Sequence, residues 1–244
     1  VYWLMGIGYS IPGNDFWDPL GTFASRIPSA FSTVLLMLFL GDTLMRYPQE
    51  NNHFIRRTAI ISSLAFALSP LVLIWGRIAV SDALLCSNLG ICLLLQWRKY
   101  ANPEGEVWFL SWIFLAFAIL TKGPVALILV GITLVLFAIF QNDFYRIWKT
   151  LRPVPGLILV FIISSPWYFI ELLIEGKPFF ESFFGYHNLQ RFTSVVNSHE
   201  EPWWFFLIIL CVASLPFTPL LVISIWDNLC NLAKRRNRLI KKAN

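Results

Sequence analysis

Five ionisable side chains could form a site for an anionic ligand, and each lies where an apolar segment of the chain ends. They are Arg77, Asp82, Lys122, His187 and Arg191. Lysine and arginine are the usual binders of phosphate oxygens, and the planar arginine fork can hold two of them. Ionisable groups at membrane depth are costly unless they are paired or used, so their presence needs a reason. The pattern predicts recognition of a lipid-linked phosphate or pyrophosphate at a membrane surface.

Each of these residues also has a structural interpretation. Arg77 and Asp82 bracket a tight turn and could form an ion pair, or Asp82 could cap the N-terminus of a helix. Lys122 could extend to the membrane surface without a ligand. His187 could be a hydrogen-bonded residue of the interface. It lies four residues before Arg191, which puts both on one face if their aromatic-rich segment is helical.

A metal site is left open by the sequence. His187, and His199 with Glu200, could provide ligands for a divalent ion, but no spacing among them is diagnostic. The four cysteines form no CxxC pair and lie in or beside apolar runs, which is typical of buried small hydrophobic residues. The sequence therefore assigns no metal ligand and no certain cofactor.

The elements that must position the candidate site are membrane helices. The chain is 57% hydrophobic and only 14% charged, with a mean hydropathy of +0.65. A soluble domain of 244 residues could not bury so many apolar segments. The runs are continuous and do not alternate as the strands of an outer-membrane barrel do. The composition therefore predicts an all-α polytopic membrane protein.

The apolar stretch 107–140 shows how neighbouring helices must connect. Lys122 is its only charged residue. At 1.5 Å per residue, a single helix of this length would reach roughly 50 Å, whereas the hydrocarbon core of a bilayer is about 30 Å thick. The Thr-Lys-Gly-Pro sequence at 121–124 provides the only turn chemistry within the stretch. Lys122 is therefore predicted at the tip of a helical hairpin.

Apolar runs separated by polar breaks predict about seven transmembrane helices in one domain, 1–244, without an internal repeat. The predicted helices span residues 27–45, 57–76, 80–98, 106–121, 123–141, 154–174 and 203–226. One long connection, 175–202, is rich in aromatic residues, which argues against disorder and favours a lid over a site.

The distribution of lysine and arginine sets the predicted orientation, because short cytoplasmic loops carry an excess of both. Fourteen of the nineteen lie in one set of loops and the tail: Arg46, Arg56, Arg57, Arg98, Lys99, Arg146, Lys149, Arg152, Lys234, Arg235, Arg236, Arg238, Lys241 and Lys242. The basic tail 227–244 is thus predicted to be cytoplasmic and near anionic lipid heads, and it does not indicate nucleic-acid binding. The candidate site residues all face the opposite side, and this confinement favours a binding site over isolated structural roles.

Short sequence motifs carry a family resemblance. In chain order they are "SRIPSAF" (25–31), "GRIAVSDALL" (76–85), "LTKGPVALIL" (120–129), "SPWY" (165–168), "HNLQRF" (187–192) and "HEEPWWFF" (199–206). The ordered set resembles the bacterial C-type membrane glycosyltransferases, in the branch of protein O-mannosyltransferases and aminoarabinose lipid A transferases. The resemblance covers about residues 1–220.

The resemblance implies an inverting glycosyltransferase of the bacterial inner membrane that uses a polyprenyl-phosphate-linked sugar on the periplasmic side. The acceptor, a lipid or a protein, stays open. By the same resemblance, Asp82, Lys122, His187 and Arg191 fall on polar positions that line or support the cavity. Membrane lipids are the other expected partners.

The start of the chain departs from the family pattern. Family members open with a helix and a periplasmic loop whose acidic motif supplies the expected general base. Here the predicted topology places Val1 outside, and no initiator methionine is present. We therefore expect a fragment in which the base lies upstream. Asp15 and Asp18 match no catalytic position.

Two other classes of protein are considered. A transporter or flippase of lipid-linked sugars commonly shows inverted repeats and ionisable groups at mid-membrane, whereas here the charges lie at the ends of apolar segments. A non-catalytic membrane assembly subunit is the second alternative. The chemistry of the site favours the transferase: cations stabilise the leaving polyprenyl phosphate, and a closed cavity keeps water from the donor.

Overall fold

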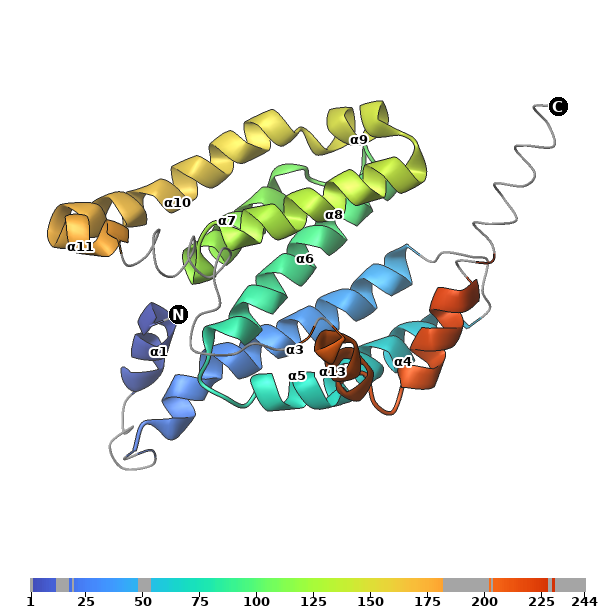
Figure 1. Cartoon of the computed structure of the whole chain (residues 1–244), viewed down its shortest axis with the longest axis horizontal. Coiled ribbons are helices and arrows are strands. Elements are labelled where there is room, and N and C mark those ends of the chain that lie inside the picture. Colours follow the sequence, from blue (N-terminus) through green and yellow to red (C-terminus); the bar gives the residue numbers. More distant parts are fainter. Residues whose placement is uncertain are drawn as a thin grey trace.

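The computed structural model describes residues 2–11, 18, 20–47, 54–181, 202, 204–227 and 230, and within these ranges all regular structure is helical (Figure 1). The described helices are α1 (Tyr2–Tyr9), α3 (Thr22–Arg46), α4 (Ile55–Leu68), α5 (Pro70–Trp75), α6 (Ser81–Ala101), α7 (Phe109–Lys122), α8 (Val125–Gln141), α9 (Phe144–Leu151), α10 (Pro153–Glu175), α11 (Lys177–Phe180) and α13 (Phe205–Ala213), followed by a helix over Thr218–Asp227. The predicted all-α class is confirmed for this part of the chain.

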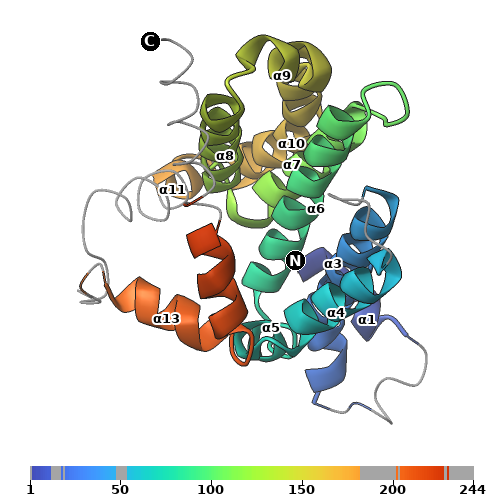
Figure 2. The same cartoon turned by 90° about the vertical axis from the view of Figure 1, so that its right-hand side faces the viewer.

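Helix α6 lies at the centre of the bundle. Both views place it between α3 and α4 on one side and α7, α8 and α10 on the other (Figures 1 and 2), and its main packing partners are α3 and α7. The largest buried cluster joins α6, α7, α8 and α10 and includes Cys92, Leu115 and Ala126. Several of its members are alanines, and small residues allow membrane helices to approach closely.

A glycine and a tryptophan fix the crossing of α10 over α7. A Cβ atom added at Gly156 would lie 2.1 Å from the ring of Trp112, so only glycine fits at this contact. The indole Nε1 of Trp112 donates a hydrogen bond to the carbonyl of Leu151, 3.0 Å away. The buried indole is thus satisfied, which removes the cost of an unpaired donor in an apolar core.

Many large apolar side chains of the described helices are exposed on the surface of the bundle. Such a surface is expected of helices that face lipid. Helices α3 and α10 are each long and apolar enough to cross a membrane. The α13 helix and the helix over Thr218–Asp227 could form a third span together, although they meet at an angle of 113°. Helices α7 and α8 are apolar but shorter.

Two predicted helices are interrupted at prolines. The helix predicted over 57–76 breaks at Ser69, whose ψ of 129° lies outside the helical region. Pro70 follows it, and proline disfavours helical geometry in the residue before it. The single helix predicted over 203–226 is wrong: α13 ends at Ala213, just before Pro216, and a second helix begins at Thr218.

Helix α9 lies in a connection that was predicted to be a cytoplasmic loop. The side chain of Asp143 caps its N-terminus by accepting a hydrogen bond from the backbone N–H of Arg146, at 3.3 Å. Its apolar residues recur at helical spacing, at positions 144, 147, 148 and 151. The helix is amphipathic, and such helices lie in the membrane interface with their cations toward water.

Candidate functional site

The centre of the candidate site is an ion pair between two helix ends. Asp82 lies in the first turn of α6 and Lys122 is the last residue of α7. The Nζ atom of Lys122 donates a hydrogen bond to Oδ1 of Asp82. Each of the two side chains is 40% exposed. The ammonium group therefore keeps donors that can reach a ligand, because lysine has three of them.

The predicted hairpin tip at Lys122 is confirmed. Helix α7 ends at Lys122, and Gly123 follows with a φ of 85°, a left-handed conformation that favours glycine. Pro124 then precedes the first residue of α8. Of the structural alternatives for Asp82, the ion pair with Arg77 does not form, because Asp82 pairs with Lys122. Asp82 lies in the first turn of α6, where its charge is favourable, but the N-cap is Val80 and no side-chain capping bond is made.

The turn before α6 is held against α3. The hydroxyl of Ser29 donates to the carbonyl of Val80 at 3.1 Å. Gly76 lies so close to α3 that an added Cβ would be 3.1 Å from Oγ1 of Thr33. The motifs at 25–31 and 76–85, far apart in the sequence, are thus in direct contact beside Asp82.

The "SPWY" motif lies at the same end of the bundle. The hydroxyl of Tyr168, on α10, donates to the carbonyl of Ile119 at 2.8 Å, one turn before Lys122 on α7. Trp167 packs edge-on against Tyr168 and Phe179, with ring centroids 4.9 Å and 6.0 Å apart. The aromatic pair therefore ties α10 to the end of α7 that presents Lys122.

A cavity of about 320 Å³ opens beside the ion pair, between α3, α5 and α6. Asp82, Thr33 and Ser87 provide polar groups in its wall, and Trp75 and Cys86 are among its other lining residues. The rest of the wall is apolar. The hydroxyls of Thr33 and Ser87 already donate to the carbonyls of Ser29 and Ser32, so Asp82 is the charged group in an otherwise apolar wall.

The other predicted site residues are only partly located. Arg77 is exposed on the turn between α5 and α6, and within the described ranges it has no ion-pair partner. His187 and Arg191 lie outside the described residues, as do His199 and Glu200. Among the residues that the structure does describe, no three histidine, cysteine, aspartate or glutamate side chains are grouped to hold a metal ion.

Asp18 has a structural role that sequence reasoning missed. Its carboxylate accepts hydrogen bonds at 2.9 Å from the backbone N–H groups of Phe23 and Ala24, and at 3.2 Å from the hydroxyl of Thr22. Burial alone would raise the pKa of Asp18, but these hydrogen bonds outweigh it, so the pKa lies below its ordinary value. The sequence offered one signal for this role: Asp18 lies four residues before Thr22, which begins an apolar run. The helix begins at Thr22, five residues earlier than predicted.

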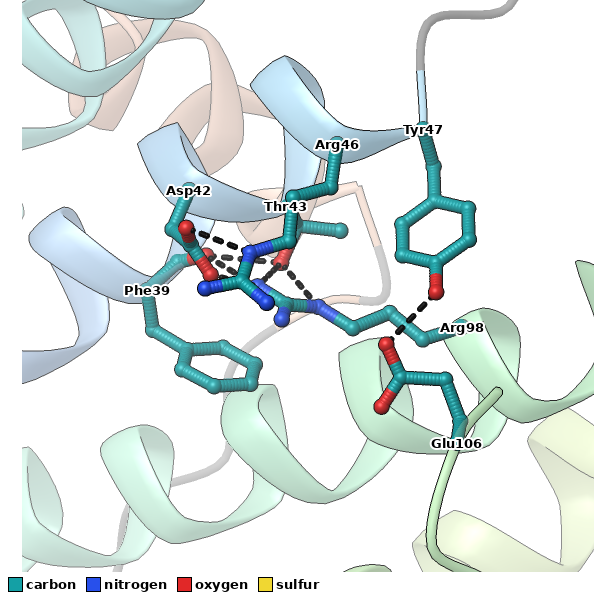
Figure 3. Close-up of polar contacts among 7 residues, drawn as sticks. All are labelled: Phe39, Asp42, Thr43, Arg46, Tyr47, Arg98 and Glu106. Atoms are coloured by element: carbon teal, nitrogen blue, oxygen red, sulfur yellow. Dashed lines mark hydrogen bonds and ion pairs between the residues drawn. The ribbon is translucent and has the colours of Figure 1, made fainter. Parts of the chain in front are cut away.

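The opposite end of the bundle carries a cation of a different kind. Arg98 is buried in the last turns of α6 and donates to Oδ2 of Asp42 at 2.8 Å, to Oγ1 of Thr43 and to the carbonyl of Phe39 (Figure 3). Its guanidinium also lies 4.1 Å from the centroid of the Phe39 ring. Arg98 was predicted among the loop charges, but it lies within α6 and joins this helix to α3.

Next to this cluster, the loop after α6 is tied back to the bundle. The hydroxyl of Tyr47 donates to the carboxylate of Glu106 at 2.6 Å (Figure 3), and this hydrogen bond raises the pKa of Tyr47. Lys99 donates to the carbonyls of Pro103 and Glu106. These contacts give Arg98 and Lys99 structural roles at this end of the bundle.

The fold and the charge distribution define an integral membrane protein with an accessible charged site at one end of a helical bundle. Comparison with known proteins gives the family. The chain belongs to the dolichyl-phosphate-mannose-protein mannosyltransferase family, which matches residues 1–170. The resemblance found in the sequence motifs is thereby confirmed.

Two curated proteins are similar to most of this chain. An uncharacterised protein of Aquifex aeolicus is 31% identical over 90% of this chain and 46% of its own length. An undecaprenyl phosphate-alpha-4-amino-4-deoxy-L-arabinose arabinosyl transferase of Erwinia tasmaniensis is 28% identical over 90% of this chain and 38% of its own length. The chain therefore spans less than half the length of the curated relatives it matches.

Solved structures confirm the fold. The crystal structure of ArnT from Cupriavidus metallidurans bound to undecaprenyl phosphate matches 92% of this chain and 39% of that protein, with a TM-score of 0.77 at 24% identity. The apo structure of the same protein matches with a TM-score of 0.73. At this level of identity the likeness concerns the arrangement of the helices.

Proposed function

We propose that this chain forms the helical core of a membrane glycosyltransferase that moves a sugar from a polyprenyl-phosphate donor to a lipid or protein acceptor. The observation that carries the proposal is the half-exposed Lys122, held by Asp82 beside a cavity of about 320 Å³. Family membership supports the reaction class. The undecaprenyl phosphate named for the relatives and for the bound ArnT structure supports the donor class.

In this reaction an acceptor oxygen attacks the anomeric carbon of the sugar, and the bond from that carbon to the phosphate oxygen breaks. The leaving polyprenyl phosphate gains negative charge, which a nearby cation stabilises more strongly than it stabilises the ground state. Lys122 is suited to this role because its ammonium group is fixed by Asp82 and still exposed. Arg191 and His187 are proposed to complete the phosphate site, and Arg77 to contribute charge at its edge.

The proposed topology has seven spans, with the Lys122 end in the periplasm and the C-terminus in the cytoplasm. Residues 1–244 form one transmembrane domain, 175–202 form a periplasmic loop and 227–244 form a cytoplasmic tail. The described cations support this orientation: Arg46, Arg56, Arg57, Arg98, Lys99, Arg146, Lys149 and Arg152 lie at or beyond the helix ends opposite Lys122. Their excess is typical of a cytoplasmic face.

The test is a transfer assay with membranes that contain the complete gene product and a donor labelled in its sugar. We expect label to move to an acceptor while unglycosylated polyprenyl phosphate accumulates. A transporter would instead deliver the intact labelled donor to the other leaflet, and an assembly subunit would do neither. Recovery of only intact donor would therefore contradict the proposal.

A further inference from the structure

At the end of the bundle opposite Lys122, a buried glutamine points to a ligand. Gln96 on α6 is 2% exposed, and neither its side-chain oxygen nor its side-chain nitrogen has a hydrogen-bond partner in the described part of the chain. An unpaired buried amide destabilises the fold, because its polar atoms lose water without gaining a partner. Gln96 lines a cavity of about 180 Å³ between α6, α8 and the end of α9. A group that enters this cavity could satisfy the amide.

The character of the cavity decides what enters it. Apart from Gln96 and Thr133, its wall is aromatic or aliphatic, with Leu93, Leu134 and Phe137 among the lining residues. The hydroxyl of Thr133 already donates to the carbonyl of Leu129 at 2.8 Å. A water molecule needs two to four polar partners, and apolar cavities of about 150 Å³ stay dry and take up apolar ligands. The cavity therefore suits a stretch of hydrocarbon that carries one hydrogen-bond acceptor.

A cation lies against one of the residues that line this cavity. Tyr100, one turn beyond Gln96 on α6, lines the cavity, and the guanidinium of Arg146 lies 4.8 Å from the centroid of its ring. Lys149 lies one turn further along α9 and is exposed. Neither cation has a carboxylate partner within the described ranges, and the nearby Asp143 accepts from a backbone N–H. The segment of α9 beside the cavity thus presents two exposed cations that can meet an anion.

The depths of these groups match one class of ligand. Gln96 and Tyr100 are four residues apart, which is about 6 Å along the helix axis. In a glycerophospholipid, ester carbonyls lie a few bonds below the phosphate, and the acyl chains continue below them. A phosphate at Arg146 and Lys149 would therefore place an ester carbonyl near Gln96 and an acyl chain against Leu93 and Phe137.

We propose that the junction of α6, α8 and α9 binds an anionic glycerophospholipid, with its phosphate at Arg146 and Lys149 and an ester carbonyl accepting from Gln96. This lipid is distinct from the sugar donor, because a polyprenyl phosphate has no ester carbonyl. The site lies at the opposite end of the bundle from Lys122. It would anchor α9 to α6 and α8 at the membrane surface.

The experiment is native mass spectrometry of the complete gene product in detergent, titrated with phosphatidylglycerol or with phosphatidylcholine of the same acyl chains. One cation near an anionic lipid contributes roughly fivefold in affinity. We expect the parent protein to prefer phosphatidylglycerol. Arg146→Gln should lower that preference about fivefold. The control is Arg56→Gln, which removes an exposed charge at the start of α4 and should leave the preference unchanged.

Gln96→Leu separates the ester contact from the charge contact. Both lipids carry the ester, so this variant should weaken both by a similar factor and leave their ratio unchanged. It removes an unpaired amide and should unfold in lipid-free detergent at the same or a higher temperature than the parent protein, which shows that the fold is intact. Equal binding of both lipids by the parent protein would overturn the proposal, as would full lipid affinity in Gln96→Leu. Displacement of phosphatidylglycerol by an equimolar amount of undecaprenyl phosphate would assign the cavity to the donor and also overturn it.

Discussion

Lys122 and Arg98 are both cations near the end of an apolar helix, but their surroundings differ. The side chain of Arg98 is 5% exposed, and it is shared among a carboxylate, a hydroxyl, a backbone carbonyl and an aromatic ring. Lys122 is 40% exposed and pairs with one carboxylate that is equally exposed. A buried cation held by several partners stabilises the fold, whereas an exposed cation with one partner keeps donors that can bind a ligand.

The two acidic partners show the same contrast. Asp42 is held by two arginines, Arg98 on the buried side and Arg46 on the exposed side. Asp82 has Lys122 as its cationic partner and also lines the cavity. At the end with more positive charge, the buried Arg98 therefore serves structure, whereas exposed cations such as Arg146 stay available to a ligand. At the other end, Lys122 lies at the candidate phosphate site.

The largest effect is expected at the buried end. Arg98→Ala would remove the guanidinium contacts with Thr43, with the Phe39 carbonyl and with one side of Asp42, and removing one member of a buried ion pair costs about 3 kcal/mol. We expect a matching fall in the free energy of unfolding in detergent, measured by chemical denaturation. The control is Arg46→Ala, which removes the exposed partner of the same Asp42 and should cost at most about 1 kcal/mol. Equal losses in the two variants would remove the distinction between the buried and exposed contacts.

A smaller effect, on catalysis alone, is expected for Arg191. We propose that its guanidinium grips two oxygens of the polyprenyl phosphate, so Arg191→Ala should lose one charge-assisted contact of roughly 1.5–3 kcal/mol. Transfer in the complete gene product should fall about ten- to a hundredfold, with accumulation in the membrane near normal. Arg191→Lys should recover only part of the rate, because lysine offers a point charge.

The matched control for Arg191 is Arg236→Ala in the basic tail, which should leave transfer almost unchanged. Undiminished transfer by Arg191→Ala would show that the arginine is only an interfacial anchor. A loss of transfer that follows entirely from poor accumulation would assign "HNLQRF" a structural role. Either outcome would confine the phosphate site to Lys122.

Much of the helical architecture could be predicted from the sequence. The hairpin at Lys122 follows from a length argument and one Gly-Pro turn, and it is confirmed. The prolines beside the breaks at Ser69 and near Pro216 could have indicated them. Each proline lies within a long apolar run, however, and the run favoured one continuous helix. Helix α9 was not predicted, because its segment of eight residues was interpreted as a loop on the basis of its charges alone.

The side-chain pairings could not be predicted, because they depend on helix packing. Asp82 is five residues from Arg77 and forty from Lys122, so sequence proximity favoured the wrong partner. The burial of Arg98 depends on the approach of α3, which brings Thr43 within 2.9 Å of its Nε atom. Composition and loop charge indicate the side of the membrane but not which cation is buried.

The most direct test of the central claim is an exchange of the two charges at the accessible end. Asp82→Lys and Lys122→Asp are combined in one variant of the complete gene product, and each single substitution is made for comparison. The single variants should lose transfer, and any loss of accumulation should be small because both side chains are 40% exposed. The exchanged pair re-forms the ion pair and should accumulate like the parent protein, while transfer per molecule stays at least roughly tenfold lower, because the cation no longer lies where the leaving phosphate needs it. Transfer at the parental rate in the exchanged variant would contradict the account and show that Asp82 and Lys122 only hold α6 and α7 together.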